Sequence, residues 1–240
     1  MIADAIMALV LAPCCAACDQ PLERPTLGCV CPSCWSSIHS LTEPLCETCG
    51  DALATWRRAG TDTRQCVRCR RLSRVIARGR AIAPYDGRLR DILHALKYNS
   101  RRSLAAPLAR RMAAAAPEIL EGADFVVPVP LHFLRHYRRG FNQAEELAKR
   151  LPVPMLRALR RTRRTATQTE LPEARRHRNV RDAFAVRWWA RDAIAEKTLV
   201  LVDDVSTTGA TLDACARALM KAGAKEIRAL TAARAVSRRR

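Results

Sequence analysis

The sequence predicts an α/β protein in which a twisted parallel sheet flanked by helices follows a small cysteine-rich module. Ten of the 11 cysteines lie within the first 69 residues. From about residue 75 onward, runs with the length of strands alternate with runs that have the period of helices. A chain of 240 residues is long enough for one α/β domain and an accessory module. We therefore expect a cysteine-rich module over residues 1–74 and an α/β domain over residues 75–240.

Basic side chains dominate the composition. The chain has 42 Lys and Arg residues against 23 Asp and Glu residues, and its formal net charge is +19. The hydrophobic fraction of 49% is too high for a disordered polycation, so the chain is expected to fold. A positive surplus of this size attracts polyanions and phosphate-bearing ligands, above all at low salt.

The chain begins with an apolar run over residues 2–11. This run has no basic residues before it and carries Asp4 in its first turn, unlike a secretory leader. An amphipathic helix is the better interpretation, with Ile2, Ile6, Leu9 and Val10 on one side. No other segment approaches the ~18 apolar residues of a membrane span. We therefore expect a cytoplasmic protein without membrane insertion, whose cysteines are reduced.

Eight cysteines form four Cys-x-x-Cys pairs. Each pair aims two thiolates at one ion, and four pairs supply the ligands of two tetrahedral zinc sites. Disulfides or reduced structural thiols are the alternatives, but an odd total argues against a complete disulfide framework. We expect two structural zinc ions bound by sequential pairs, although the spacing alone also allows interleaved pairs. The predicted ligands are Cys15, Cys18, Cys31 and Cys34 for the first ion, and Cys46, Cys49, Cys66 and Cys69 for the second.

Helical and strand patterns follow the cysteine-rich module. Hydrophobic residues recur at helical spacing over residues 88–98, and a second helix is expected over residues 104–116. A short apolar run over residues 125–129 has the length of a strand. After a basic turn, a further helix is expected over about residues 142–151. The cation Lys97 near the end of the first helix fits either a capping role or contact with a ligand.

The last three elements predict a βαβ unit. Residues 198–202 are β-branched or Leu, which is typical of a strand buried on both faces of a parallel sheet. A helix is expected over about residues 211–222, with Gly223 as its C-terminal stop. A second strand is expected over residues 227–232. Strand, helix and strand in this order predict a parallel pair with a right-handed crossover.

The first strand of this unit leads directly into a polar loop. Asp203 and Asp204 follow the apolar run, and a buried strand that ends in two carboxylates is costly unless a ligand or cation uses them. The loop then supplies hydroxyl groups, a glycine and the start of the next helix, whose free N–H groups favour a phosphate. Carboxylates beside a phosphate cradle indicate a sugar phosphate, whereas a strand-end turn and a helix cap are the alternative. The predicted cradle consists of Ser206, Thr207, Thr208, Gly209, Ala210 and Thr211.

Residues 199–211 resemble the signature for 5-phosphoribosyl-1-pyrophosphate (PRPP) in type I phosphoribosyltransferases. With further motifs, the chain is identified as a member of the ComF family, amidophosphoribosyltransferase-like proteins linked in some bacteria to competence for DNA uptake. Besides the Cys-x-x-Cys pairs, these motifs are Cys34-Trp35, Cys49-Gly50, Tyr85-Asp86-Gly87, Lys97-Tyr98, Pro128-Val129-Pro130-Leu131, Arg139-Gly140-Phe141-Asn142-Gln143, Thr165-x-x-Gln168, Arg176-x-x-Asn179 and Ala183-Phe184. The chain departs from the family pattern at Phe133-Leu134 and at Glu170.

The resemblance implies a type I phosphoribosyltransferase fold behind a double zinc ribbon, with PRPP and Mg²⁺ as ligands. It assigns the catalytic role to Asp203 and Asp204. It also places Arg135 and Arg139 on a loop facing the pyrophosphate, and Arg176 on a mobile flap over about residues 162–184. Between residues 157 and 191 there are 11 Arg against three acids, and guanidinium groups stabilise the charge of a leaving pyrophosphate. A nucleic-acid-binding surface is the open alternative for this segment.

Three functions are compatible with these observations. The leading hypothesis is a PRPP-binding, phosphoribosyltransferase-like protein that acts in DNA uptake, whose status as an enzyme the residues leave open. The second is an accessory protein that binds single-stranded DNA and works with the uptake machinery, with a regulatory or vestigial PRPP site. The third is a salvage enzyme for a free base, for which the sequence carries no mark of a base pocket.

Several single residues leave two roles open. Surface positions are expected for His132 and His136, with phosphate contact as the alternative. The tryptophans are expected to pack rather than to stack on bases; they are Trp35, Trp56, Trp188 and Trp189.

Overall fold

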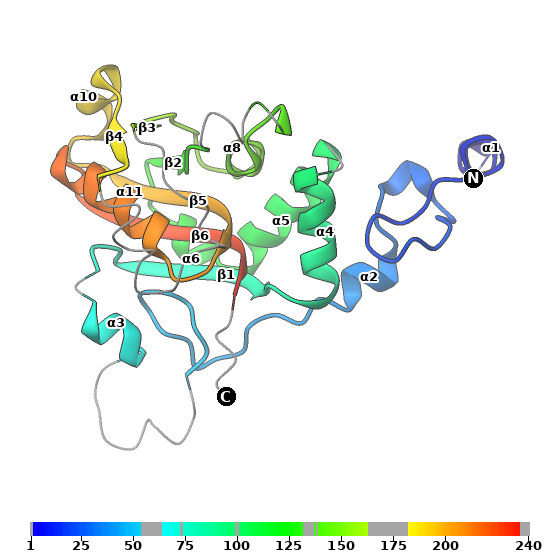
Figure 1. The fold of residues 1–240 in the computed structure, drawn as a ribbon, viewed down its shortest axis with the longest axis horizontal. Coiled ribbons are helices and arrows are strands. Elements are labelled where there is room, and N and C mark those ends of the chain that lie inside the picture. Colours follow the sequence, from blue (N-terminus) through cyan, green and yellow to red (C-terminus); the bar gives the residue numbers. More distant parts are fainter. Residues whose placement is uncertain are drawn as a thin grey trace.

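A parallel four-stranded sheet forms the centre of the computed structural model, which describes residues 2–53, 64–72, 74–98, 101–131, 137, 139–162 and 182–235. The strand order is β1-β6-β5-β2, and every neighbouring pair is parallel. The strands are β1 (Arg78–Pro84), β2 (Phe125–Pro128), β5 (Thr198–Ser206) and β6 (Glu226–Arg234) (Figure 1).

Strand β5 is buried on both faces, as its run of β-branched residues and Leu predicts. Val200 and Val202 point into one hydrophobic cluster, and Leu199 and Leu201 point into another on the opposite face. This alternation follows from the two-residue period of a strand. The parallel βαβ unit is therefore confirmed, but β5 continues beyond the predicted end to Ser206.

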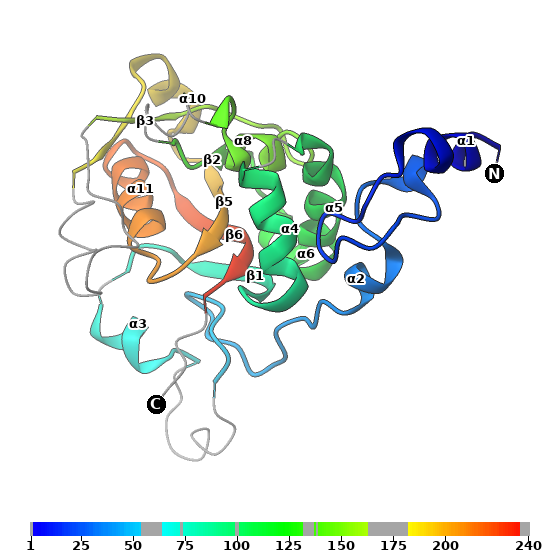
Figure 2. The same ribbon diagram turned by 45° about the vertical axis from the view of Figure 1, so that its right-hand side comes forward.

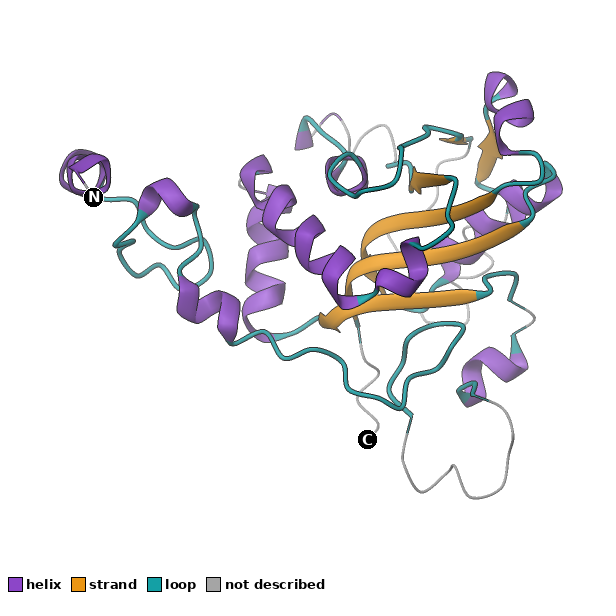
Figure 3. Ribbon diagram, turned by 180° about the vertical axis from the view of Figure 1, so that it is seen from behind, coloured by secondary structure: helices purple, strands orange, loops and turns teal. Residues whose placement is uncertain are grey.

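Helices cover the first face of the sheet. These are α4 (Gly87–Tyr98), α5 (Ala105–Ala115), α6 (Pro117–Leu120) and α8 (Gln143–Ala148). The 3₁₀ turn η3 (Arg102–Leu104) leads into α5. Figure 3, which views the molecule from behind, shows helices crossing this face. The two predicted helices over residues 88–98 and 104–116 are confirmed, and the one predicted over residues 142–151 is shorter.

The second face is covered by α11 (Ala210–Lys221), so that the sheet lies between α11 and the pair α4 and α5 (Figure 2). An antiparallel pair, β3 (Leu159–Arg161) and β4 (Phe184–Val186), packs beside α11. The turn η5 (Trp188–Ala190) and the helix α10 (Arg191–Ile194) complete this face. Trp188 is 84% exposed, so the prediction that the tryptophans pack is wrong for this residue.

The N-terminal residues form two separate four-cysteine units. The first unit, residues 13–37, includes η1 (Pro25–Leu27) and α2 (Pro32–Ser36) and follows α1 (Ile2–Leu11). It lies beside α4 and α5, where Arg88 donates to the carbonyl of Ala17 at 2.8 Å and the Arg111 guanidinium lies 4.5 Å from the Trp35 ring centre (Figure 1). None of the helices in the described ranges is long and apolar enough to cross a membrane.

The second four-cysteine unit comprises residues 44–53 and 64–72 and includes α3 (Val67–Arg71). It packs along β1, where the N–H of Gly79 donates to the carbonyl of Glu47 at 2.9 Å. Strand β1 was not predicted from the sequence, because Arg78 and Arg80 interrupt its short apolar run. The aliphatic stems of such arginines can lie along apolar surface while the charged ends reach acids, and Arg80 pairs with Glu118 at 3.1 Å.

Candidate functional site

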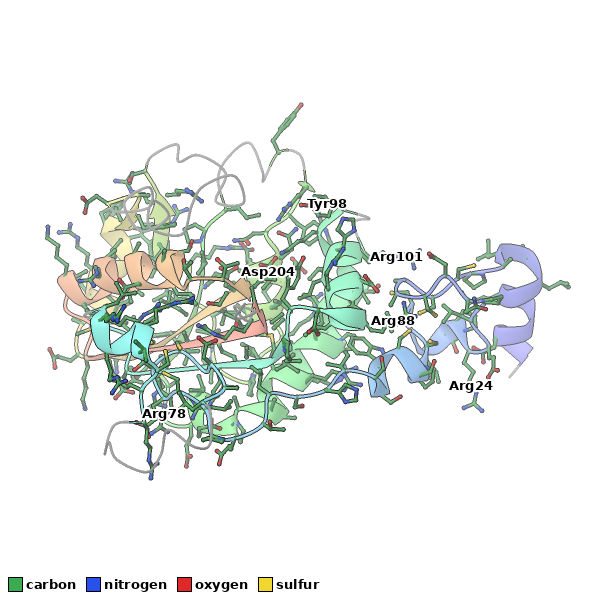
Figure 4. The ribbon with its side chains drawn as sticks, turned by 60° about the horizontal axis from the view of Figure 1, so that its bottom comes forward. Arg24, Arg78, Arg88, Tyr98, Arg101 and Asp204 are labelled. Atoms are coloured by element: carbon green, nitrogen blue, oxygen red, sulfur yellow. The ribbon has the colours of Figure 1, made fainter. Side chains whose placement is uncertain are left out.

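The two predicted catalytic acids lie at the carboxyl end of β5 and point to opposite faces of the sheet. Asp204 shares the face of Val202, and its Oδ2 lies 2.8 Å from Nζ of Lys97, on α4. Only 13% and 14% of these two side chains are exposed. Figure 4 shows Asp204 beside α4, with Tyr98 at the end of that helix. Lys97, for which capping or contact with a ligand was expected, therefore forms an ion pair with a predicted site residue.

Burial and charge set the protonation of this group. Burial and the neighbouring carboxylate of Asp204 raise the pKa of Asp203 to about 7. Burial alone would lower the pKa of Lys97, but the carboxylate of Asp204 more than offsets this and raises it. Lys97 is thus a permanent cation, whereas Asp203 changes its charge near neutral pH.

The predicted phosphate cradle follows directly after the acids. Gly209 has a φ of 76°, in the left-handed region that favours glycine, and it precedes the first residue of α11, Ala210. The N–H of Ala210 donates to the Thr208 hydroxyl at 3.3 Å. Among the described residues, none accepts a hydrogen bond from the backbone N–H of Thr207, Thr208 or Gly209. These three donors and the positive end of α11 form a site suited to an anion.

The other predicted phosphate contacts are only partly described. Arg139 donates to the Tyr98 hydroxyl at 3.3 Å and to Oε1 of Gln143 at 3.1 Å, which places it beside the end of α4 that carries Lys97. Asn142, from the same motif, caps α8 and donates to the carbonyl of Val129 at 3.0 Å. The predicted positions of Arg135, Arg176, His132, His136, Trp56 and most of the flap lie outside the described residues.

The structure brings the eight predicted metal ligands together as two clusters of sequential pairs, in each of which the four sulfur atoms lie within 4.8 Å of one another. The Cys15–Cys34 and Cys18–Cys31 sulfurs are 3.8 Å apart, and the Cys49–Cys66 sulfurs are 3.7 Å apart. Four thiolates arranged tetrahedrally at about 2.3 Å from a zinc ion would be about 3.8 Å apart, so the donor set fits that ion.

Backbone donors support thiolates in both clusters, and a side-chain hydroxyl does so in the first. The N–H of Cys31 donates to the sulfur of Cys15, and the N–H of Cys66 donates to the sulfur of Cys46, both at 3.3 Å. The hydroxyl of Ser33 lowers the pKa of Cys31 to about 6. Hydrogen bonds of this kind favour the charged sulfur that a metal ion requires.

Two arginines that contact the phosphate loop were not predicted from the sequence. Arg74 donates to the carbonyl of Thr208 at 2.6 Å, and Arg234 donates to the Ser206 hydroxyl at 3.4 Å. Once β5 and β6 are aligned in register, Arg234 falls opposite Ser206, so the strand pairing was a usable signal for Arg234. The sequence carries no comparable signal for Arg74.

Comparisons with known proteins agree with this geometry. Residues 104–240 match the family described as phosphoribosyl transferase domain. The chain is 31% identical over 226 residues to DNA utilization protein YhgH of Salmonella typhi, covering 89% of this chain and 93% of that protein. It is 29% identical over 216 residues to Competence protein F of Haemophilus influenzae (86% and 90% covered). It is 26% identical over 204 residues to Competence protein ComFC of Bacillus subtilis (81% and 79% covered).

The raised pKa of Asp203 predicts a stability that depends on pH. The ordinary pKa of an Asp side chain is 3.8, and that of Asp203 in the folded protein is about 7. Between these two pH values the folded protein keeps a proton that the unfolded chain has lost. The free energy of unfolding therefore falls as pH rises through this window, by at most about 4 kcal/mol. Asp203→Asn removes this loss, so the variant should gain stability over the wild type between about pH 4 and pH 7 in urea unfolding.

The exposed Asp192, on α10, provides the control. Asp192→Asn should follow the pH profile of the wild type. Parallel profiles for the wild type and Asp203→Asn would contradict the assigned environment of Asp203.

Proposed function

Since this chain belongs to the ComF family and carries a phosphoribosyl transferase domain, we propose that it binds PRPP and acts in the uptake or use of DNA. The observation that carries the proposal is the carboxyl end of β5, where one half-buried and one buried carboxylate stand beside a loop whose N–H groups at residues 207–209 have no acceptor among the described residues. Few small ligands need both features, and a ribose with a 5′-phosphate does. The competence and DNA utilization names of the relatives supply the biological setting.

In this proposal each part of the site binds one part of PRPP. Asp203 and Asp204 accept hydrogen bonds from the ribose hydroxyls, and the loop over residues 206–211 holds the 5′-phosphate. Lys97 and Arg139, on the α4 side, face the pyrophosphate, together with Arg135 and Arg176. Mg²⁺ bound with PRPP would neutralise pyrophosphate oxygens, and a cation fits here because it would favour the ionised form of Asp203.

Displacement of pyrophosphate from C1 of the ribose would need no nucleophile from the protein. A positive charge would develop on the ribose ring and negative charge on the leaving pyrophosphate. In this proposal the carboxylates stabilise the first, and Lys97 and Arg139 stabilise the second; the contacts of Lys97 with Asp204 and of Arg139 with Tyr98 support it. We propose binding of PRPP as the function of the site and assign no acceptor.

The proposal extends to the N-terminal residues. We assign residues 1–74 to a double zinc ribbon and residues 75–240 to the phosphoribosyltransferase-like domain. Zinc suits the two clusters because four thiolates at tetrahedral spacing are its usual structural ligands. Thiolate sites of this kind persist in a reducing compartment, which is consistent with a cytoplasmic location.

Elemental analysis of freshly purified protein tests the zinc assignment. We expect about two zinc ions per chain, one in each cluster. Cys215→Ser should retain both, because Cys215 is buried in α11 and belongs to neither cluster. Only trace zinc in the wild type would refute the assignment.

Titration calorimetry with PRPP and Mg²⁺ tests the sugar-phosphate site. Asp203→Asn together with Asp204→Asn removes both carboxylates, and we expect the affinity to fall at least about tenfold because charged hydrogen bonds to the ribose are lost. Asp192→Asn, an exposed acid away from β5, should bind as the wild type does. Equal affinity in the double variant and the wild type would overturn the proposed site.

A second candidate function, binding of single-stranded DNA, has an observation in its favour. Trp188 and Trp189 are adjacent in η5 and are 84% and 45% exposed. Val186 and Arg191, which flank this pair in the chain, line a cavity of about 1190 Å³ between β3, β4 and α11. Its charged lining residues are four bases and two acids: Arg160, Arg191, Arg217, Lys221, Asp182 and Asp213. Exposed aromatic rings next to a basic groove are the features on which unpaired bases stack and a phosphate backbone binds.

Fluorescence titration with an oligothymidylate probe tests this candidate. We expect the logarithm of the affinity to fall linearly with the logarithm of the salt concentration, and Trp188→Ala to weaken binding about tenfold. Leu27→Ala, which truncates an exposed apolar residue on the first four-cysteine unit, is the control and should have no effect. Absent binding, or a Trp188→Ala variant that binds as the wild type does, would count against it.

A further inference from the structure

The second four-cysteine unit lies closer to the sheet than side chains would allow. A Cβ atom placed on Gly79, in β1, would lie 2.8 Å from the carbonyl oxygen of Thr48. A Cβ atom on Gly50 would lie 3.0 Å from the carbonyl oxygen of Gly79. The turn that carries Cys46 and Cys49 therefore rests directly on the backbone of β1.

Arg74, which follows Cys69 and α3, reaches from this unit to the phosphate loop. Besides the bond from its Nη2 to the carbonyl of Thr208, its Nη1 lies only 2.3 Å from where a Cβ of Gly209 would be. The guanidinium thus lies against the backbone of the loop. Its Nε is buried and has no hydrogen-bond partner among the described residues. An unpartnered buried donor next to three free N–H groups points to an anionic ligand.

Arg234 makes a second connection between the unit and the loop. Both oxygens of the Asp51 carboxylate accept hydrogen bonds from its guanidinium, the one from Nη2 at 3.0 Å. Its Nη1 donates to the hydroxyl of Ser206, the first residue of the cradle. The backbone carbonyl of Asp51 accepts from the N–H of Cys46 at 2.7 Å. The pair of Asp51 and Arg234 therefore joins a cysteine turn to the loop.

We infer that the second four-cysteine unit is part of the phosphate site. With metal bound, the unit holds Arg74 and the pair of Asp51 and Arg234 against the loop, and Arg74 donates to the phosphate. The inference rests on the proposed binding of PRPP. It follows physically because the unit has little hydrophobic core, so that metal binding supplies much of its folding free energy. The first unit, by contrast, packs on α4 and α5.

The two clusters allow a matched experiment on the full-length protein. Cys46 and Cys15 are each the first ligand of their cluster, and both are fully buried. We expect Cys46→Ser and Cys15→Ser each to lower the zinc content by about one ion per chain. In calorimetry with PRPP and Mg²⁺, Cys46→Ser should weaken binding at least about tenfold, and Cys15→Ser less than about twofold. Equal effects of the two variants would overturn the inference.

Arg74 variants test the contact without disturbing a cluster. Arg74→Ala should keep the full zinc content and weaken the binding of both PRPP and ribose 5-phosphate by the same factor, about tenfold, because both ligands carry the 5′-phosphate and differ only at C1. Arg74→Lys should restore part of the affinity, and Arg71→Ala, an exposed arginine on α3, is the control. Unchanged affinity in Arg74→Ala would overturn the inference if the wild type binds PRPP. A wild type that does not bind PRPP would instead overturn the proposed function.

Discussion

The parallel pairing of β5 with β6 and β2 is the constraint on which the rest of the molecule depends. Because β5 is buried on both faces, its two-residue period decides which layer each side chain meets. The same alternation sends Asp204 toward Lys97 on α4 and sends Asp203 toward the side of α11. The register with β6 then sets Arg234 opposite Ser206. One strand thus positions both acids, the phosphate loop and the arginine that joins the loop to the N-terminal residues.

The elements around this strand could be predicted where the local pattern is strong. Three patterns can each be recognised within a few residues: the apolar run before Asp203, the glycine before α11 and the four Cys-x-x-Cys pairs. Strand β1 could not be predicted in this way. Its arginines become compatible with a strand only because Glu118 pairs with one of them and the second four-cysteine unit covers its outer edge. Both of those neighbours are tertiary contacts, which a local pattern does not report.

The contacts of the phosphate loop could be predicted from the sequence only in part. Ser206 and Gly209 belong to a recognisable motif, but Arg74 lies in a segment whose only pattern is its cysteines. Nothing in its local sequence separates Arg74 from Arg71, which is exposed on α3. The difference arises from where the metal-binding turns are seated on β1, and that depends on backbone approaches at Gly50 and Gly79. Knowing the ligands of a metal site therefore does not reveal what its neighbours touch.

The site carries local costs that a bound ligand would relieve. Burial keeps Asp203 near its titration point, and the buried Nε of Arg74 lacks a partner among the described residues. A sugar phosphate would bring hydroxyl donors to the carboxylates and phosphate acceptors to the guanidinium, and a bound cation would favour the charged form of Asp203. Folded proteins tolerate such unsatisfied groups mainly where function needs them. A carboxylate whose pKa burial has raised and a guanidinium donor without an acceptor among the described residues thus favour a ligand with hydroxyls and phosphate over a simple anion.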